Sequence, residues 1–497
     1  MPLEKKQILI YPFFIGMIPL FFVVHGCLYY YGFIRPPEAA SLALSYCLSA
    51  FVVYLLLWLL YRRNTGKAAV LTAFLLIIYF FFGAYHDFLL RHIPVTGRYS
   101  VLLPLLVFTL LIVIWRIKKA QSLKRTIIFL NLVFLAYLLI DGAMLLGNYI
   151  HPPASKFTVA GKTVYKPTAN IEKPDIYFLI FDEYASSLSL RESYGYKNDL
   201  NLYLEQKGFH IQERSFSNYN YTPASIASIL NMSFISGIKD STVLTAKDMN
   251  YCIELIKSNE VMKFFSWQGY QIINCSDFNV LNNPVAVSEQ LLPIKTRLIT
   301  DNTLWSKINK DIFWNFYTGS FSVNWLIVRR TYEVDQNNRQ LLQMIKEQSR
   351  KKNTHPVFVF GHLYMPHQPF YYDKNNRLRD RQSIITDELH NPAAAYLGYL
   401  SHVNLEIREL IDTIQHNTNH KSVIILMGDH GYRGKHIGED LHQNYQNLNA
   451  VYLPGKNYNL FYDSISGVNQ FKTVLNTLFD QTIPLLKDST IFLTGKE

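Results

Sequence analysis

The first 150 residues of the chain are dominated by long apolar runs, and these runs constrain the fold more than any other feature of the sequence. A helix that crosses a bilayer needs about 20 mostly apolar residues. A cleaved signal peptide is disfavoured, because further apolar runs follow the first and no cleavage site with small residues is evident. The sequence therefore predicts five membrane spans, at roughly 8–31, 40–61, 68–86, 99–116 and 126–149.

Lysine and arginine are unevenly distributed over the loops between these spans. Loops rich in them stay on the cytoplasmic side. With the N-terminus inside, the outer loops hold only Arg35, Arg91 and Arg98. Five spans then place the chain after residue 150 outside the cytoplasmic membrane, and the net charge of +11 reflects topology rather than a nucleic-acid partner. The inner side holds Lys5, Lys6, Arg62, Arg63, Lys67, Arg116, Lys118, Lys119, Lys124 and Arg125.

Four polar residues lie in or near the spans: His25, His86, Asp87 and Asp141. An acid inside a membrane can mark a functional site. We favour a structural role for Asp141, in which it bonds a neighbouring helix or lies close enough to the outer surface to be wet. The same structural interpretation is favoured for His25.

The composition divides the chain into three parts: membrane helices in 1–150, an extended linker in 151–173, and an outer domain in 174–497. The outer domain alternates strand-like with helix-like stretches, which favours an α/β fold with a largely parallel sheet covered on both faces. Ligands of such sheets gather at the carboxyl ends of strands. The clearest strands are 176–181, 270–274, 357–361, 423–428 and 450–454, and the helical candidates are 223–234, 335–350 and 395–415.

Cysteine is sparse, and no CxxC pair or disulfide framework is visible. Cys27 and Cys47 lie in apolar runs. Cys252 and Cys275 lie in the polar part, where they either form a bridge or remain as two buried thiols.

The strand-like segment KSVIILMGDH delivers Asp429 and His430 side by side at its end. An acid and an imidazole at the tip of a buried strand can hold a metal ion or perform acid–base chemistry. Asp182 and Glu183 follow the strand-like IYFLIF in the same way. Adjacent residues on a strand point to opposite faces, so we expect one of these two acids to point into the site unless the backbone turns there.

Thr222 precedes Pro223 at the start of an apolar helical pattern. Proline suits the first turn of a helix, which puts Thr222 at the N-cap. The residue is then either a cap alone, or a nucleophile whose product anion rests on the free N–H groups of the helix terminus. A threonine hydroxyl needs a metal or a base to activate it.

The segment HLYMPHQPF supplies His362 and His367, and its prolines favour a rigid extended loop. Arg433 suits a pair of phosphate or sulfate oxygens. His436 or His442 could complete a second metal site or contact a phosphate. Three motifs are absent from the sequence: the CxPxR motif of formylglycine sulfatases, the GxxxxGK[ST] phosphate loop and the GxSxG elbow.

Four segments together resemble the alkaline phosphatase/sulfatase superfamily: PDIYFLIFDEYAS, SNYNYTPASIASILNM, FVFGHLYMPHQPF and ILMGDHGYRG. With five spans before them, they look like its membrane-anchored branch of sulfatase-like hydrolases and transferases. That branch includes lipoteichoic acid synthases and phosphoethanolamine transferases. The resemblance implies an alkaline phosphatase-like outer domain with a largely parallel central sheet.

The resemblance also implies roles for individual residues. Thr222 would be the nucleophile, and its oxygen would face a divalent metal, Zn or Mn, held by Asp182, Asp429 and His430. One or two ions could bind, and Glu183 could compete with Asp182 as a ligand. Contacts to the substrate phosphoryl group, or to a second metal, would come from His362, His367, Arg433 and His442. Thr222 is flanked by Tyr221 and Pro223 rather than by the small residues common in that branch, which leaves the substrate open.

The predicted activity is metal-dependent transfer of a phosphoryl-linked headgroup, phosphoglycerol- or phosphoethanolamine-like, through a phospho-threonine intermediate. The donor would be a membrane phospholipid and the acceptor a lipid or a glycan of the cell envelope. The site would face outward from the inner (cytoplasmic) membrane. Two alternatives remain at this stage: a membrane-anchored phosphodiesterase or sulfatase that transfers to water, and a non-catalytic scaffold or transporter-like protein that uses Asp141.

Overall fold

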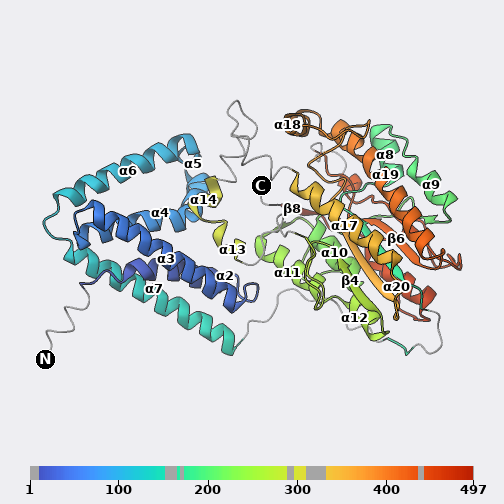
Figure 1. The fold of residues 1–497 in the computed structure, drawn as a ribbon, viewed down its shortest axis with the longest axis horizontal. Helices are drawn as coiled ribbons and strands as arrows, with labels where there is room; N and C mark the ends of the chain where they lie inside the picture. The colour runs from blue at the N-terminus through green and yellow to red at the C-terminus, as the bar shows by residue number, and fades with distance from the viewer. Residues whose placement is uncertain are drawn as a thin grey trace. The chain divides into compact units, whose positions relative to one another are not determined.

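The chain folds into two units, which we describe separately. In the computed structural model one unit comprises residues 1–154 and 292–321, and the other comprises 155–291 and 322–497 (Figure 1). The structure describes residues 10–151, 165–167, 173–287, 296–308, 332–434 and 441–495.

The first unit consists of helices that match the five apolar runs. Four of them are long and apolar enough to cross a membrane, so the chain is an integral membrane protein. The remaining one, α2, has 16 residues and is shorter than a span requires, and the first span stays a prediction. The helices are α2 (Phe14–Tyr29), α3 (Pro36–Leu60), α4 (Thr65–His92), α5 (Pro94–Gly97), α6 (Tyr99–Lys119) and α7 (Lys124–Ile150).

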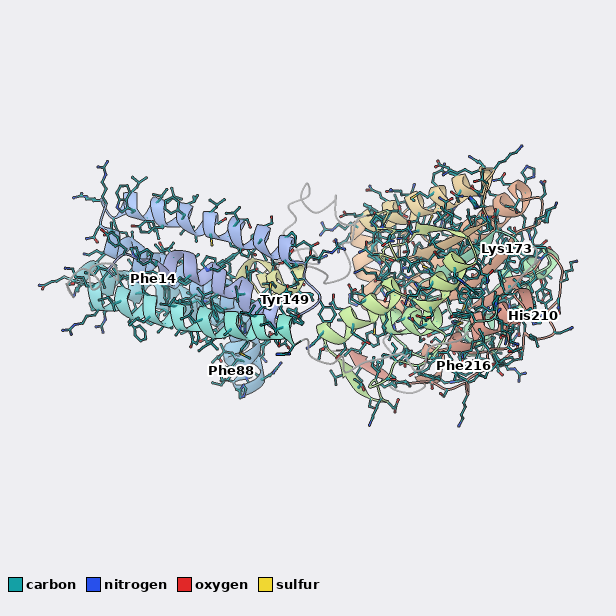
Figure 2. The ribbon with its side chains drawn as sticks, turned by 90° about the horizontal axis from the view of Figure 1, so that it is seen from below. Phe14, Phe88, Tyr149, Lys173, His210 and Phe216 are labelled. Carbon is teal, nitrogen blue, oxygen red and sulfur yellow. The ribbon has the colours of Figure 1, made fainter. Side chains whose placement is uncertain are left out.

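Apolar side chains cover the outside of this unit as well as its centre. Phe14 is fully buried between helices, whereas Phe88 and Tyr149 are each 54% exposed (Figure 2). Helices that are apolar all round are typical of a bilayer environment. The buried acid Asp141 is paired: its Oδ2 lies 2.8 Å from Nδ1 of His25 on α2. The predicted bond from Asp141 to a neighbouring helix is confirmed.

Part of the chain that follows the outer domain's fourth strand returns to this unit. Residues 296–308, the described part of this segment, belong to it and contain two short helices, α13 (Arg297–Thr300) and α14 (Leu304–Lys307). Lys307 at the end of α14 forms a 2.9 Å ion pair with Asp87 of α4. The sequence analysis assigned this segment to the outer domain, and nothing in its pattern indicated the return.

Two glycines make room for the returning segment. A Cβ at Gly26 would lie 2.6 Å from Ile299, and one at Gly83 would lie 2.6 Å from the Asn302 carbonyl oxygen. The Gly83 N–H also donates to that carbonyl at 2.8 Å. Ile299 is 2% exposed and belongs to the apolar core of the helices. The segment is therefore packed into the helices rather than resting on their surface.

The second unit is built on a mostly parallel six-stranded sheet in the order β2–β7–β6–β1–β5–β4. The central strand β1 is parallel to both β5 and β6, and β4 is parallel to β5, while β7 and β2 add an antiparallel edge. The predicted α/β class is confirmed. The strands are β1 (Ile176–Phe181), β2 (His210–Ile211), β4 (Gln271–Cys275), β5 (Val357–Leu363), β6 (Val423–Gly428) and β7 (Asn449–Tyr452).

Helices cover both faces of this sheet, which explains why β1, β5 and β6 are buried throughout. On one face Tyr177 and Leu179 share a core with α17 and α19. On the other face Phe178 packs edge-on against Phe471 of α20. The predicted helices correspond to α10 (Thr222–Asn231), α17 (Glu333–Arg350) and α19 (Pro392–Asn417); α12 (Glu260–Trp267) and α20 (Gly467–Leu478) were not predicted.

Cys252 and Cys275 are both buried and free. The alternative of two buried thiols is therefore correct, and no bridge joins them.

Candidate active site

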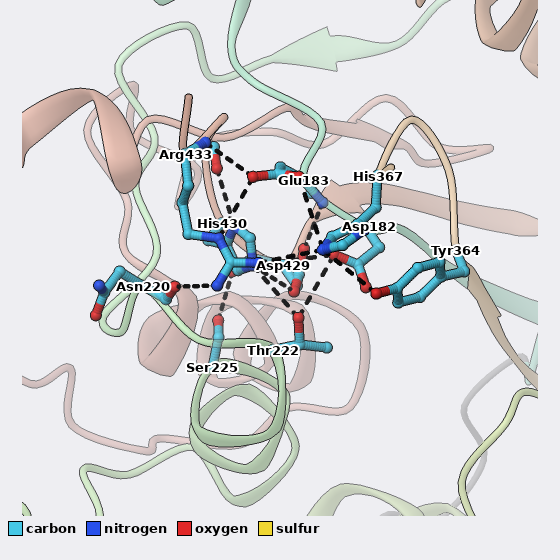
Figure 3. A network of polar contacts seen from close by, with 12 residues as sticks. Asp182, Glu183, Asn220, Thr222, Ser225, Tyr364, His367, Asp429, His430 and Arg433 are labelled. Carbon is cyan, nitrogen blue, oxygen red and sulfur yellow. Dashed lines mark hydrogen bonds and ion pairs between the residues drawn. The ribbon is translucent and has the colours of Figure 1, made fainter. Parts of the chain in front are cut away.

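The carboxyl ends of three neighbouring parallel strands bring the site together. Phe181 at the end of β1 is level with Gly428 of β6 and Leu363 of β5, so the residues that follow these strands meet at one edge. Asp182, Asp429 and His430 each offer one ligand atom, and these atoms lie within 4.8 Å of one another. The predicted convergence of these three side chains is what the structure shows (Figure 3).

The backbone turns between Asp182 and Glu183, and it sends the two carboxylates to different partners. Glu183 has a φ of 64°, in the left-handed region. Its N–H donates to Asp429 Oδ1 at 2.8 Å, which secures the second acid of the cluster. Its own carboxylate accepts from the backbone N–H of Arg433 at 2.8 Å and from Nε of the same residue at 3.3 Å. Glu183 therefore fixes Arg433 rather than replacing Asp182.

Thr222 lies beside this cluster and does not cap its helix. Helix α10 begins at Thr222, and the N-cap position belongs to Tyr221, whose side chain makes no cap hydrogen bond. The expectation that Thr222 is the N-cap is wrong by one residue. Its Oγ1 instead lies 3.4 Å from Asp182 Oδ1 and 3.3 Å from His430 Nε2. A hydroxyl that lies this close to an acid and an imidazole fits a reacting group better than a helix cap.

Within the described part of the chain, each of the two acids of the cluster has one carboxylate oxygen without a hydrogen bond. Asp182, Asp429 and His430 are fully buried. Among the described residues, Oδ2 of Asp182 and Oδ2 of Asp429 have no hydrogen-bond partner. Burial and the neighbouring Asp182 raise the pKa of Asp429 to about 7. Buried carboxylate oxygens without partners are costly, and a cation between them would remove that cost.

His430 has the form that a metal ligand requires. Burial and the nearby Arg433 lower the pKa of His430 to about 4, so the ring is neutral. Its Nδ1 lies 2.8 Å from the Gly431 carbonyl oxygen, which accepts the ring proton. Nε2 is left with a lone pair that points toward Thr222 and Asp429. Two carboxylates and one neutral imidazole are a suitable donor set for a divalent ion.

His362 lies at the other side of Asp182, with a partner that the sequence analysis missed. Its Nδ1 is 2.6 Å from Asp277 Oδ1, and its Nε2 is 3.6 Å from Asp182 Oδ2. Burial alone would lower the pKa of His362, but the Asp277 and Asp182 carboxylates raise it well above its ordinary value. Asp277 comes two residues after the end of β4, so the rule that found the other acids could have found it too.

Arg433 and His367 form a second group beside the cluster (Figure 3). Besides Glu183, the Arg433 guanidinium donates to the Asn220 carbonyl at 3.3 Å and lies 3.3 Å from His367 Nε2. The OH of Tyr364 is 3.3 Å from the same imidazole nitrogen. The predicted residues Glu183, His367 and Arg433 are thus close together, and Tyr364 is an addition to them.

The roles predicted for two other histidines stay predictions. His442 lies in the short helix η2 (Leu441–Asn444) with its side chain exposed. His436 lies outside the described residues. Ser225, one turn into α10, was not predicted either; its hydroxyl donates to the Asp429 carbonyl oxygen.

The site thus combines a hydroxyl at a helix start with two buried acids and an imidazole, at the carboxyl edge of a parallel sheet. Residues 288–471 match the protein-family model described as Sulfatase. The matched range contains His362, His367, Asp429, His430 and Arg433. The match covers less than half of the chain, so this part of the chain is similar to sulfatases, and it follows helices that are long and apolar enough to cross a membrane.

Solved structures with a similar arrangement are distant. The C-terminal periplasmic domain of phosphoethanolamine transferase EptC from Campylobacter jejuni is 14% identical, with 64% of this chain and 92% of that chain covered and a TM-score of 0.39. The corresponding EptC domain of Escherichia coli is 13% identical, with 69% and 93% covered and a TM-score of 0.40.

The phosphonate monoester hydrolase SpPMH from Silicibacter pomeroyi is 15% identical, with 64% and 76% covered and a TM-score of 0.38. Likenesses at this level carry no inference about the activity of this chain. The search of curated protein sequences gave no match.

Proposed function

We propose that the protein is a metal-dependent transferase that moves a phosphoryl-linked headgroup from a membrane phospholipid to a lipid or glycan of the cell envelope. The observation that carries this proposal is the position of Thr222. Its Oγ1 lies within 3.4 Å of an oxygen of Asp182 and of Nε2 of His430, in a cluster where Oδ2 of each acid has no hydrogen-bond partner among the described residues. A hydroxyl in that place can act as a nucleophile.

The residues that would hold the metal are Asp182, Asp429 and His430, with Thr222 Oγ1 as a further ligand. A divalent ion there would offset the charge of the phosphoryl oxygens and make the threonine hydroxyl easier to deprotonate. The donor set suits Zn or Mn. His362 Nε2 and Asp182 Oδ2 face each other at 3.6 Å and neither has a hydrogen bond among the described residues, so either a second ion or a phosphoryl oxygen could engage them.

The proposed reaction has two steps, in which Thr222 is first the nucleophile and then the leaving group. Thr222 Oγ1 attacks phosphorus in line, the bond from phosphorus to the first alcohol breaks, and that alcohol leaves with a proton. A second hydroxyl then attacks the phospho-threonine and releases Thr222. His362 and Arg433 would hold the phosphoryl oxygens during both steps, because a guanidinium fixed by Glu183 presents its N–H groups in one direction.

The membrane helices support a substrate that is itself anchored in the membrane. Tethering enzyme and lipid to one surface raises the effective concentration of the lipid. The excess of lysine and arginine in the loops assigned to the inner side supports a catalytic domain on the extracytoplasmic side of the inner membrane.

Transfer to water is the second candidate, and the match to a model described as Sulfatase favours it. The full chain in liposomes with a phospholipid labelled in its headgroup separates the two activities. A transferase moves the label to an added lipid or glycan acceptor, whereas a hydrolase releases it as a free headgroup.

Thr222→Ala is the decisive variant for either activity. We expect it to abolish turnover while the protein still folds and binds metal, and we expect mass spectrometry to detect phosphorylated Thr222 only in the unsubstituted chain. Thr413→Ala is the matched control, since that threonine lies on α19 and bonds only a carbonyl of its own helix at 2.7 Å. Turnover that persists in Thr222→Ala would remove this residue as the nucleophile.

A further inference from the structure

Hydrogen bonds from its own buried side chains stabilise the loop that follows β4. The Asn274 amide donates to the carbonyl oxygens of Phe278 at 2.8 Å and Pro284 at 3.0 Å, and Ser276 Oγ donates to Asn274 Oδ1 at 2.7 Å. Asn274 is 8% exposed and Ser276 is fully buried. Asp277 lies between these residues, so its position is fixed by the loop before any contact with His362 is considered.

The contact between Asp277 and His362 leaves the imidazole with one orientation. A carboxylate only accepts hydrogen bonds, so the 2.6 Å contact requires a proton on Nδ1 of His362. The Phe278 ring packs against the imidazole, with 5.3 Å between ring centroids. His362 is 1% exposed. Its Nε2 then faces Asp182 Oδ2 at 3.6 Å, and it has no hydrogen-bond partner among the described residues.

The other two histidines near the site are oriented in a different way. Nδ1 of His430 lies 2.8 Å from the carbonyl oxygen of the next residue, and Nδ1 of His367 lies 2.7 Å from the carbonyl oxygen of Gln368. Both rings are therefore fixed by their own backbone. Of these three, His362 is the one whose ring is fixed by a side chain at the end of another strand. A substitution of that side chain can therefore change the orientation of the ring.

We propose that Asp277 is a positioning residue for phosphoryl transfer: it fixes the ring of His362 so that Nε2 faces Asp182, the acid that also contacts Thr222 Oγ1. The inference rests on the proposed function for the role of His362 at the phosphoryl group. Without Asp277, the imidazole can rotate by about 180° about its Cβ–Cγ bond, and its two nitrogens then exchange places. Partners that orient a functional histidine in this way typically change activity by 10- to 100-fold when removed.

The first test compares Asp277→Ala with the unsubstituted full chain, using bis(4-nitrophenyl) phosphate as a soluble diester probe. We expect kcat to fall about 10- to 100-fold, with a smaller change in KM and an unchanged metal content. Asp277→Asn should recover part of the loss, because an amide oxygen can still accept the Nδ1 proton. Asp463→Ala is the control, since Asp463 pairs with Arg214 in an exposed position.

A second comparison separates positioning from a general effect on the fold. His362→Ala and the double variant Asp277→Ala/His362→Ala should have the same kcat, because an aspartate that acts through His362 has nothing left to orient. Losses that multiply in the double variant would overturn the proposal, since Asp277 would then act on its own.

A third measurement does not depend on turnover and keeps this proposal apart from the proposed function. The exchange rate of the imidazole C2 hydrogen, followed by mass spectrometry, reports the surroundings of each histidine. Asp277→Ala should change the rate at His362 and leave that at His430 unchanged. An unchanged rate at His362 would overturn the positioning role even if Thr222 proves to be the nucleophile. A changed rate would stand even if Thr222→Ala retained activity.

Discussion

The buried aspartate of the first unit and the two buried aspartates at the candidate site of the second unit have different surroundings. In the helices of the first unit, Asp141 is paired with His25 at 2.8 Å, and Asn131 both accepts from Phe14 N–H and donates to the Tyr11 carbonyl. In the second unit, Asp182 and Asp429 are fully buried, and each has an oxygen without a partner among the described residues. Hydrogen-bonded side chains link neighbouring helices. A buried carboxylate oxygen without a hydrogen bond lowers the stability of the fold, and a bound ligand can restore that stability.

Asp429→Asn should have the largest effect on activity and an opposite effect on stability. Turnover should fall more than about 100-fold, since even groups outside the metal's direct contacts cost 10- to 100-fold. The metal-free protein should become more stable, because the substitution removes one of two repelling carboxylates. The pKa of Asp429 in the fold is about 7 against an ordinary 3.8, so the metal-free chain loses stability as the pH rises across that window.

Thermal unfolding of both chains in chelator at pH 5 and pH 8 checks this expectation. The unsubstituted chain should be less stable at pH 8 than at pH 5, and the gap between it and Asp429→Asn should widen at the higher pH. A variant less stable than the unsubstituted chain at pH 8, with no metal present, would mean that the two acids do not repel each other.

Metal removal should destabilise the second unit and leave the first unit unchanged. A ligand present at about 1,000 times its dissociation constant stabilises a fold by about 4 kcal/mol. Chelation should therefore lower the unfolding temperature of the second unit, and readdition of Zn or Mn should restore it. Proteolysis within each unit, read by mass spectrometry, distinguishes the two. Equal protection with and without chelator would argue against a metal in the cluster.

Asp141→Ala should have the smallest effect of the three. Polar contacts between membrane helices contribute about 0.6 kcal/mol on average and at most about 1.7 kcal/mol. The variant should lower the thermal stability of the first unit slightly and should not change turnover of a soluble diester. A large loss of turnover on that probe would assign Asp141 a part in catalysis and weaken the distinction between the two units.

Much of the sheet and the centre of the site could be predicted because the signals were local. The runs 176–181 and 423–428 are uninterrupted and apolar, and both became strands with those bounds. In a parallel sheet, residues that follow such strands meet at one edge. The closeness of Asp182 and Asp429 could therefore be predicted from the sequence. Asp277 follows a strand that was also predicted, but two residues separate it from the strand's end, and no motif marked it.

Other features could not be predicted because they depend on distant contacts. The helices α13 and α14 have four residues each, too few for a periodic pattern. Their place is set by Gly26 and Gly83, more than 200 positions earlier in the chain. Likewise, Thr222 is the first residue of α10 rather than its N-cap, and its hydroxyl contacts Asp182 and His430. Both partners are distant in the sequence, so a local pattern could not predict these contacts.

The return of residues 292–321 to the first unit has a practical consequence for anyone who wishes to produce the enzyme in soluble form. A truncation that begins at residue 155 would remove α2, against which Ile299 packs, although Ile299 is only 2% exposed in the intact chain. Uncovered aliphatic side chains of this kind promote aggregation. An expression fragment should therefore also replace the 292–321 stretch with a glycine–serine spacer.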